Sequence, residues 1–239
     1  MLPPPPTGGG WGVGTSMIRL TGIERVFPVG DEEVHALRGV DLAIAAGEYL
    51  SIMGPSGSGK SSLLNIIGLL DRPNAGSYFL DERDVTALSD DELARVRREK
   101  IGFVFQFFHL VPRLTAAQNI ELPMVLAGID PAERSRRLDA LLGEYGLAER
   151  AGHRPDQLSG GQCQRVAIAR AMSMRPGVIL ADEPTGNLDR HTGQEVIGVL
   201  EQLHAAGGTL VIVTHDGEIG GRARRRIRIV DGEIVADES

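Results

Sequence analysis

A glycine-rich segment at residues 54–61, which reads GPSGSGKS, limits the folds open to this chain more than any other part of it. It fits the pattern G-x-x-x-x-G-K-[ST], and it lies between an apolar run with strand character at residues 49–53 and a stretch with helix character. Glycines let backbone N–H groups turn inward around phosphate oxygens, and a helix start adds partial positive charge. A merely flexible Gly/Ser loop would need neither the strand nor the helix. The predicted phosphate-binding residues are Gly54, Pro55, Ser56, Gly57, Ser58, Gly59, Lys60, Ser61 and Ser62.

Two side chains of this loop have separate predicted tasks. Lys60 is one of two lysines in the chain and would reach the β- and γ-phosphates of a nucleotide. The Ser61 hydroxyl would be a ligand of Mg²⁺. The motif therefore predicts a nucleoside triphosphate with its metal ion as the ligand.

A second motif ends an apolar strand in two carboxylates. Residues 178–183 read VILADE, and an acid at the carboxyl end of a parallel strand lies beside the crevice where ligands bind. We expect Asp182 to hold Mg²⁺ through water and Glu183 to act as general base toward an attacking water. By itself, such a pair more often marks an ordinary strand end. The phosphate loop in the same chain favours the functional interpretation.

A third motif, LSGGQ at residues 158–162, combines a serine and two glycines at a predicted helix start. Free N–H groups there could bind an anion by the same logic as the phosphate loop. A plain serine N-cap explains the same residues. The motif alone leaves both interpretations open for Ser159, Gly160, Gly161 and Gln162.

Composition limits the class of protein further. The 239 residues carry a formal net charge of -7, and 42% of them are hydrophobic, enough for a sizeable core. A single cysteine, Cys163, excludes a disulfide framework and a cysteine-based zinc site and fits a reducing, cytoplasmic setting. The negative balance argues against a protein that coats nucleic acid nonspecifically. No apolar run approaches the roughly 18 residues of a membrane span, and we recognise no secretory signal.

Strand and helix patterns alternate from Met17 onward and predict one α/β domain over residues 17–236 with a mainly parallel sheet. Residues 1–16 are rich in proline and glycine, so we expect a disordered extension, with Met17 as the true or an alternative start. Strands are expected near residues 17–27, 34–46, 48–53, 101–105, 178–182 and 209–214, and helices near 60–70 and 190–205. Asp231-Gly232 predicts a terminal hairpin between residues 225–230 and 233–236.

Residues 107–175 differ from the rest of the domain because they contain helix signals and no clear strand. Helices are expected to begin at Thr115, Asp130 and Ser159, and another begins earlier at Ser89, where Glu92 completes a capping box. This pattern predicts a helical subdomain inserted in the α/β core.

Together, these motifs resemble those of the ATP-binding subunit of an ABC transporter, and the resemblance covers about residues 17–236. It implies an α/β P-loop NTPase (RecA-like) core with a mainly parallel sheet, an antiparallel β subdomain and an inserted α-helical subdomain. In that family LSGGQ is the signature, which contacts the γ-phosphate bound to the other subunit of a head-to-tail dimer. The resemblance thus implies ATP and Mg²⁺ as cofactors, ATP hydrolysis, and a homodimer or heterodimer of ATPase subunits.

Further residues are assigned by matching family motifs. Phe27 matches the aromatic that stacks on adenine, and Gln106 the glutamine that senses Mg²⁺ and the attacking water. Asp189 belongs to the loop that crosses the dimer interface, and His215 matches the histidine that contacts the γ-phosphate. Three of them have a simpler explanation when taken alone: Phe27 as a core aromatic, Gln106 as a solvated polar residue and His215 as a strand-end turn residue. Their shared order along the chain favours the functional roles.

The resemblance extends to a subgroup. The segments FQFFHLVP at residues 105–112 and ADEPTGNLD at residues 181–189 are most similar to those of the lipoprotein-release and macrolide-export group. This implies an integral membrane permease subunit with few spans as partner, a place at the cytoplasmic face of the cell membrane, and no nucleic acid. Two other functions stay open: a cell-division ATPase that regulates a wall hydrolase through a membrane partner, and a soluble ABC ATPase of DNA repair or translation. The arginine-rich run at residues 222–228 is interpreted as a solvated rim.

Overall fold

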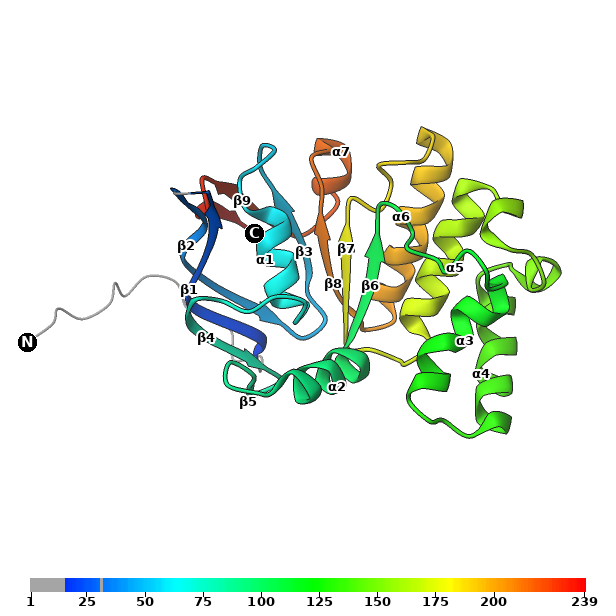
Figure 1. Ribbon diagram of the computed structural model, residues 1–239. Helices are drawn as coiled ribbons and strands as arrows, with labels where there is room; N and C mark the ends of the chain where they lie inside the picture. The colour runs from blue at the N-terminus through cyan, green and yellow to red at the C-terminus, as the bar shows by residue number, and fades with distance from the viewer. Residues whose placement is uncertain (1–15, 31) are drawn as a thin grey trace, which may run out of the picture.

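A computed structural model describes residues 16–30 and 32–239, which form two β-sheets with helices packed between and beside them (Figure 1). Residues 1–15, predicted to be disordered, lie outside the described residues. Ser16 was placed in the same extension, but it is the first residue of strand β1.

The larger sheet has six strands in the order β10-β9-β3-β8-β7-β6. All neighbours are parallel except the terminal hairpin of β9 and β10. β7 and β8 are almost entirely buried, which explains their continuous runs of Val, Ile and Leu. The strands are β3 (Tyr49–Met53), β6 (Ile101–Phe105), β7 (Val178–Asp182), β8 (Thr209–Val213), β9 (Arg225–Val230) and β10 (Glu233–Glu238), each close to its predicted range.

The smaller sheet is antiparallel, with the order β2-β1-β4-β5. β1 (Ser16–Val29) and β2 (Glu32–Ala45) were predicted, whereas β4 (Ala75–Leu80) and β5 (Arg83–Asp84) were not. The turn between β4 and β5 uses Asp81 and Glu82, both with positive φ. Such turns are normally marked by Asn-Gly or Asp-Gly, so this hairpin carries no recognisable signal.

Side-chain caps start most of the helices where the sequence predicts. The capping boxes of Ser89 with Glu92 and of Thr115 with Gln118 are present, and Asp130 caps the helix that has proline at its first position. The first helix was predicted over residues 60–70 but ends at Ile67. Gly68, which follows it, packs closely against the ring of Phe103. The helices are α1 (Lys60–Ile67), α2 (Asp90–Lys100), α3 (Ala116–Leu126), α4 (Pro131–Glu144), α5 (Gly160–Met172), α6 (Arg190–Ala205) and α7 (Gly217–Gly220), with 3-10 turns at Ala148–Arg150 and Pro155–Gln157.

Two apolar clusters hold these layers together. One joins α1 to both sheets, and the other packs the opposite face of the large sheet against α3, α5 and α6. Within residues 107–175, all of which are described, the structure has helices and no strand. Figure 1 places these helices at the end of the molecule away from the antiparallel sheet.

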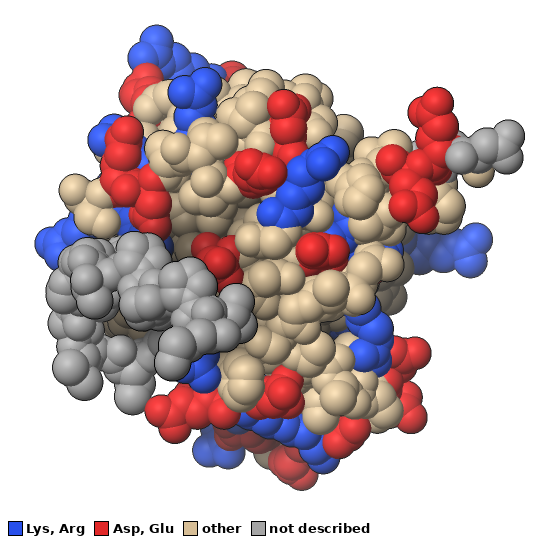
Figure 2. All heavy atoms as spheres, turned by 90° about the vertical axis from the view of Figure 1, so that its left-hand side faces the viewer, with Lys and Arg blue, Asp and Glu red and all other residues tan. Residues whose placement is uncertain are grey.

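Acidic and basic side chains are interspersed on the face that carries the antiparallel sheet (Figure 2). Several arginines of the run at residues 222–228 are paired with acids: Arg222 with Glu201, and Arg226 with Glu238. The prediction of a solvated rim is wrong for Arg225, which is 8% exposed and bridges Glu48 and Asp237. Across residues 16–30 and 32–239, no helix is both long and apolar enough to cross a bilayer.

Candidate active site

The predicted site residues follow the carboxyl ends of four strands that are neighbours in the large sheet. The order β3-β8-β7-β6 places the glycine-rich loop after β3, His215 after β8, Asp182 and Glu183 at the end of β7, and Gln106 after β6. Because parallel strands end at one edge, these groups line the same crevice. The topology thus brings together residues up to 161 positions apart in sequence.

The glycine-rich loop is packed so tightly that side chains are excluded at two points. A Cβ at Gly54 would lie 2.1 Å from the carbonyl oxygen of Ile229, and one at Gly59 would lie 2.3 Å from that of Ala36. Both glycines also have positive φ. The loop therefore packs closely between β2 and β9. Its backbone conformation requires glycine at positions 54 and 59.

The polar atoms of this loop suit a phosphate ligand. The Lys60 ammonium donates to the carbonyl oxygens of Gly54, at 2.9 Å, and Pro55, at 2.7 Å, so its charge lies within the loop. The Ser58 hydroxyl is buried without a hydrogen-bond partner among the described residues. A cation and an unpaired buried hydroxyl in a glycine cradle are what an anionic ligand would satisfy.

The two carboxylates at the end of β7, Asp182 and Glu183, repel each other. Burial raises the pKa of Asp182, the neighbouring Glu183 raises it further, and Lys60 opposes the shift. Carboxylate and hydroxyl oxygens are the ligands that Mg²⁺ prefers, so Asp182 and Ser61 have the right chemistry for that ion. A bound cation would also relieve the repulsion between the two carboxylates.

Glu183 is held by the loop after β8. Its Oε1 lies 2.7 Å from Nδ1 of His215 and accepts the backbone N–H of His215 at 3.0 Å. The Thr214 hydroxyl donates to Oε2 at 3.3 Å. The backbone of Glu183 has a φ of 45°, an unusual conformation for a residue with a side chain. Two of the three predicted catalytic residues, Glu183 and His215, are therefore in direct contact.

Gln106 contacts the segment that follows β7. Its Nε2 donates to Oδ1 of Asn187 at 3.3 Å, and Nδ2 of Asn187 donates back to the Gln106 carbonyl at 3.0 Å. Gly186 leaves room for this amide, since a Cβ there would lie 2.7 Å from Gln106 Nε2. The residues after β6 and β7 thus form one polar unit.

The LSGGQ segment forms the start of α5. Ser159 and Gln162 make a capping box, so the serine N-cap is present. Gly160 lies against Leu188, in the segment after β7, and Gly161 lies against Thr192 of α6; neither lies against the glycine-rich loop of its own chain. Two glycines at this helix start keep the N–H edge open for an external ligand.

Asp189 and Phe27 occupy the flanks of the site. Asp189 caps α6, and hydrogen bonds from Thr192 lower its pKa. Phe27, on β1, pairs in register with Val34, two residues before Ala36, whose carbonyl touches Gly59. The guanidinium of Arg25 lies over the Phe27 ring, 4.2 Å from its centroid. The antiparallel sheet therefore brings an aromatic ring toward the glycine-rich loop.

Two residues at this site were missed from the sequence. Thr214 donates to Glu183, and Gln164 of α5 donates to the backbone at the ends of both β6 and β7. Gln164 carried a usable signal, since it lies on the helix face of Gly161 and Ile168, where apolar or small residues are expected.

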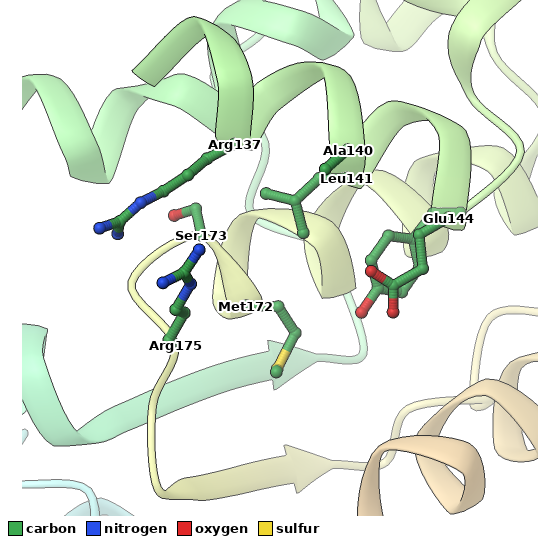
Figure 3. A pocket seen from close by; sticks show the side chains of 8 residues that line it. Arg137, Ala140, Leu141, Glu144, Met172, Ser173 and Arg175 are labelled. Carbon is green, nitrogen blue, oxygen red and sulfur yellow. The ribbon is translucent and has the colours of Figure 1, made fainter. Parts of the chain in front are cut away.

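A separate pocket of about 190 Å³ lies between α4 and the end of α5. Figure 3 shows the guanidinium groups of Arg137 and Arg175 at one end and Glu144 at the other, with Leu141 and Met172 between them. The predicted site residues lie elsewhere, so this pocket is distinct from the crevice at the strand ends.

The fold and the crevice define a P-loop nucleotide-binding protein of the α/β class. The family model described as ABC transporter matches residues 37–186. The chain belongs to the ABC transporter family. The predicted family and fold class are thereby confirmed.

Curated relatives are longer than this chain. It is 52% identical over 224 residues to the macrolide export ATP-binding/permease protein MacB of Rhodopseudomonas palustris, covering 94% of this chain and 34% of the relative. It is 54% identical over 221 residues to the protein of the same name from Burkholderia thailandensis, covering 92% and 34%. The chain therefore spans about a third of the length of the curated relatives it matches.

Solved structures match over nearly the whole chain. One is the dimeric structure of a post-hydrolysis state of the ATP-binding cassette MJ0796 bound to ADP and Pi, with a TM-score of 0.86 and 46% identity, covering 93% of this chain and 98% of that one. Another is cbiO1 from Clostridium perfringens, part of the ABC transporter complex cbiONQ, with a TM-score of 0.82 and 27% identity, covering 93% and 88%.

Proposed function

We propose that this chain binds ATP with Mg²⁺, hydrolyses it as one half of a head-to-tail dimer, and thereby drives a membrane permease. The observation that carries the proposal is the convergence of the Lys60 loop, the Asp182–Glu183 pair, His215 and Gln106 at one edge of the sheet. Phosphoryl transfer to water needs positioning and charge neutralisation above all, and these groups supply both.

The glycine-rich loop holds the triphosphate. Its backbone N–H groups and Lys60 bind the phosphate oxygens, and Phe27 stacks on the adenine. Ser61, Asp182 and Gln106 hold Mg²⁺, which when bound neutralises phosphate charge and orients the γ-phosphate. The buried, unpaired Ser58 hydroxyl and the raised pKa of Asp182 support this assignment.

Glu183 acts as general base in the hydrolytic step. It takes a proton from water while the water oxygen bonds to the γ-phosphorus, and the bond to the bridging oxygen of ADP breaks. His215 both holds the Glu183 carboxylate and contacts the γ-phosphate. Gln106 positions the water. The contacts of Glu183 with His215 and Thr214 support a shared role.

A second subunit completes each site. Ser159, Gly160, Gly161 and Gln162 contact the γ-phosphate held by the partner, and Asp189 lies at the dimer interface. The position of this helix start beside Leu188, rather than at the loop of its own chain, supports an action in trans. The partner is a second copy or a related ATPase subunit.

The membrane partner docks beside Gln106. Four exposed apolar side chains belong to the segment after β6 and to the end of α3: Phe107, Val111, Val125 and Leu126, with Phe107 67% and Leu126 70% exposed. Such residues suit an apolar element of a permease. We place the chain at the cytoplasmic face of the membrane, in a macrolide-export or lipoprotein-release type of machine with a few-span permease.

Trapping the ATP-bound state tests this function. Glu183→Gln removes the base and leaves the phosphate loop intact, so in MgATP we expect the mass from light scattering to double from 25.6 kDa, while the wild-type protein returns to monomer as ATP is consumed. A Glu183→Gln protein that stays monomeric in saturating MgATP contradicts the proposal.

The same trapped protein, purified from gently solubilised membranes of its host, identifies the partner. A few-span permease supports the export or lipoprotein-release assignment. A permease linked to a wall hydrolase would move the chain to the cell-division type. Ribosomes or DNA without a membrane protein would replace the transport assignment by the soluble one.

A further inference from the structure

A fully buried amide, Gln164, joins helix α5 to the two strand ends that carry Glu183 and Gln106. Gln164 is 0% exposed, and its Nε2 donates to the Pro184 carbonyl at 2.6 Å and to the Phe105 carbonyl at 3.3 Å. Pro184 directly follows Glu183, and Phe105 directly precedes Gln106. One side chain therefore fixes the backbone next to both residues.

The backbone at Glu183 needs such support. A residue with a side chain is strained in the left-handed region and persists there only where its surroundings enforce it. Two bonds here come from nearby backbone: Glu183 N–H to Val213 O at 2.9 Å, and Gly186 N–H to Glu183 O at 3.0 Å. Gln164, on helix α5, adds a bond to the carbonyl of Pro184, the residue that follows Glu183. The turn that aims Glu183 thus depends on where α5 lies.

Helix α5 contacts the segment after β6 at a second point. Arg170 donates to the carbonyls of His109, at 2.5 Å, and Phe108, at 2.8 Å, both of which have positive φ. Ser159, the N-cap of the same helix, lies five residues before Gln164. A displacement of α5 that follows contact of the LSGGQ segment with a ligand must therefore pull on both strand ends.

Stability alone does not account for a glutamine at this position. Its Oε1 is buried without a hydrogen-bond partner among the described residues, and an unsatisfied buried oxygen costs free energy. A methionine would fill a similar volume without that cost. The polar side chain is therefore explained by the two bonds that its N–H groups donate.

We propose that Gln164 is a positioning residue, which transmits displacement of helix α5 to Glu183 and Gln106. The inference rests on the proposed ATPase function, because it assigns Gln164 to the assembly of that site. It predicts that loss of the two donated bonds impairs the catalytic step and leaves nucleotide binding to the Lys60 loop intact.

Gln164→Met is the test variant, since it keeps the volume and removes both donated bonds. Ser173→Ala is the matched control, because Ser173 is 1% exposed at the other end of α5 and its hydroxyl donates to the Arg170 carbonyl of the same helix. We expect Gln164→Met to lower kcat roughly 10- to 100-fold, with the ATP dissociation constant within about twofold of wild type. Equal kcat in the two variants would overturn the inference.

Hydrogen exchange gives a readout that does not depend on hydrolysis. Without nucleotide, amides at residues 106–109 and 185–187 should exchange faster in Gln164→Met than in Ser173→Ala, because the two bonds from Gln164 to the strand ends are gone. With ATP, both variants should protect residues 54–62, but only Ser173→Ala should also protect residues 159–165 and 185–187. Identical exchange in the two variants refutes the role of Gln164. A wild-type protein in which ATP fails to protect residues 54–62 refutes the proposed function instead, and the nucleotide-free comparison still decides on Gln164.

Discussion

At the scale of single residues, the crevice is formed by side chains that lie far apart in the sequence and contact one another in the fold. Lys60, Asp182, Glu183, His215 and Gln106 were all named from motifs, and the structure places them after neighbouring strands. Motifs could not reveal the contacts among these residues. The bonds of Gln164 to two strand ends required coordinates, because they join α5 to backbone atoms that carry no sequence signature.

The repulsion between Asp182 and Glu183 makes a testable residue-scale prediction. Burial and the adjacent Glu183 raise the pKa of Asp182, so its ionised form destabilises the metal-free protein near neutral pH. Asp182→Asn should therefore raise Tm without Mg²⁺ and nucleotide, by roughly 2–4 °C for each kcal/mol relieved. The stabilisation that MgATP gives the wild type should be reduced in this variant.

Differential scanning calorimetry with and without MgATP makes this measurement. Asp139→Asn is a suitable control, since it removes an exposed acid on α4 away from the crevice. A lower Tm for metal-free Asp182→Asn than for Asp139→Asn would show that the two carboxylates do not repel each other in the folded protein.

At the scale of elements, local signals predicted helix starts and failed at one hairpin. Ser89, Thr115 and Asp130 cap helices as expected because capping is a local hydrogen bond. β4 and β5 were missed because their turn uses two acidic residues at positive φ, which only the surrounding sheet enforces. β4 matters to the site, since it links the antiparallel sheet to helix α1.

Two buried tyrosines, one with and one without a hydrogen-bond partner for its hydroxyl in the described part of the chain, allow the link between β4 and α1 to be tested. The Tyr78 hydroxyl on β4 donates to the Ile67 carbonyl at the end of α1, at 2.6 Å. The Tyr49 hydroxyl is buried with no partner among the described residues, and burial raises the pKa of Tyr49 to about 12. Tyr78→Phe should lower the free energy of unfolding by about 1–3 kcal/mol, and Tyr49→Phe should leave it nearly unchanged or raise it.

Urea unfolding at neutral pH distinguishes the two variants. A larger loss for Tyr49→Phe than for Tyr78→Phe would mean that β4 is not tied to α1 through this bond.

At the scale of the whole molecule, the proposed function assigns two half-sites to one chain. The Lys60 loop and the LSGGQ helix start belong to different parts of the fold, and in this chain the helix start contacts the segment after β7. Sequence motifs indicated both halves and the family. They did not show that α5 is tied through Gln164 and Arg170 to the strand ends that complete the crevice.

Mixing two inactive variants tests the head-to-tail account most directly. Lys60→Ala disables the phosphate loop, and Gly160→Asp places a negative charge where the γ-phosphate would lie, in a helix turn that tolerates an acid. In a mixed dimer, the intact loop of one chain faces the intact helix start of the other. ATPase activity should therefore return to about a quarter of wild type, since about half of the dimers are mixed and each has one complete site. If the mixture hydrolyses ATP no faster than the separate variants, the phosphate loop of one chain does not act with the LSGGQ helix start of another.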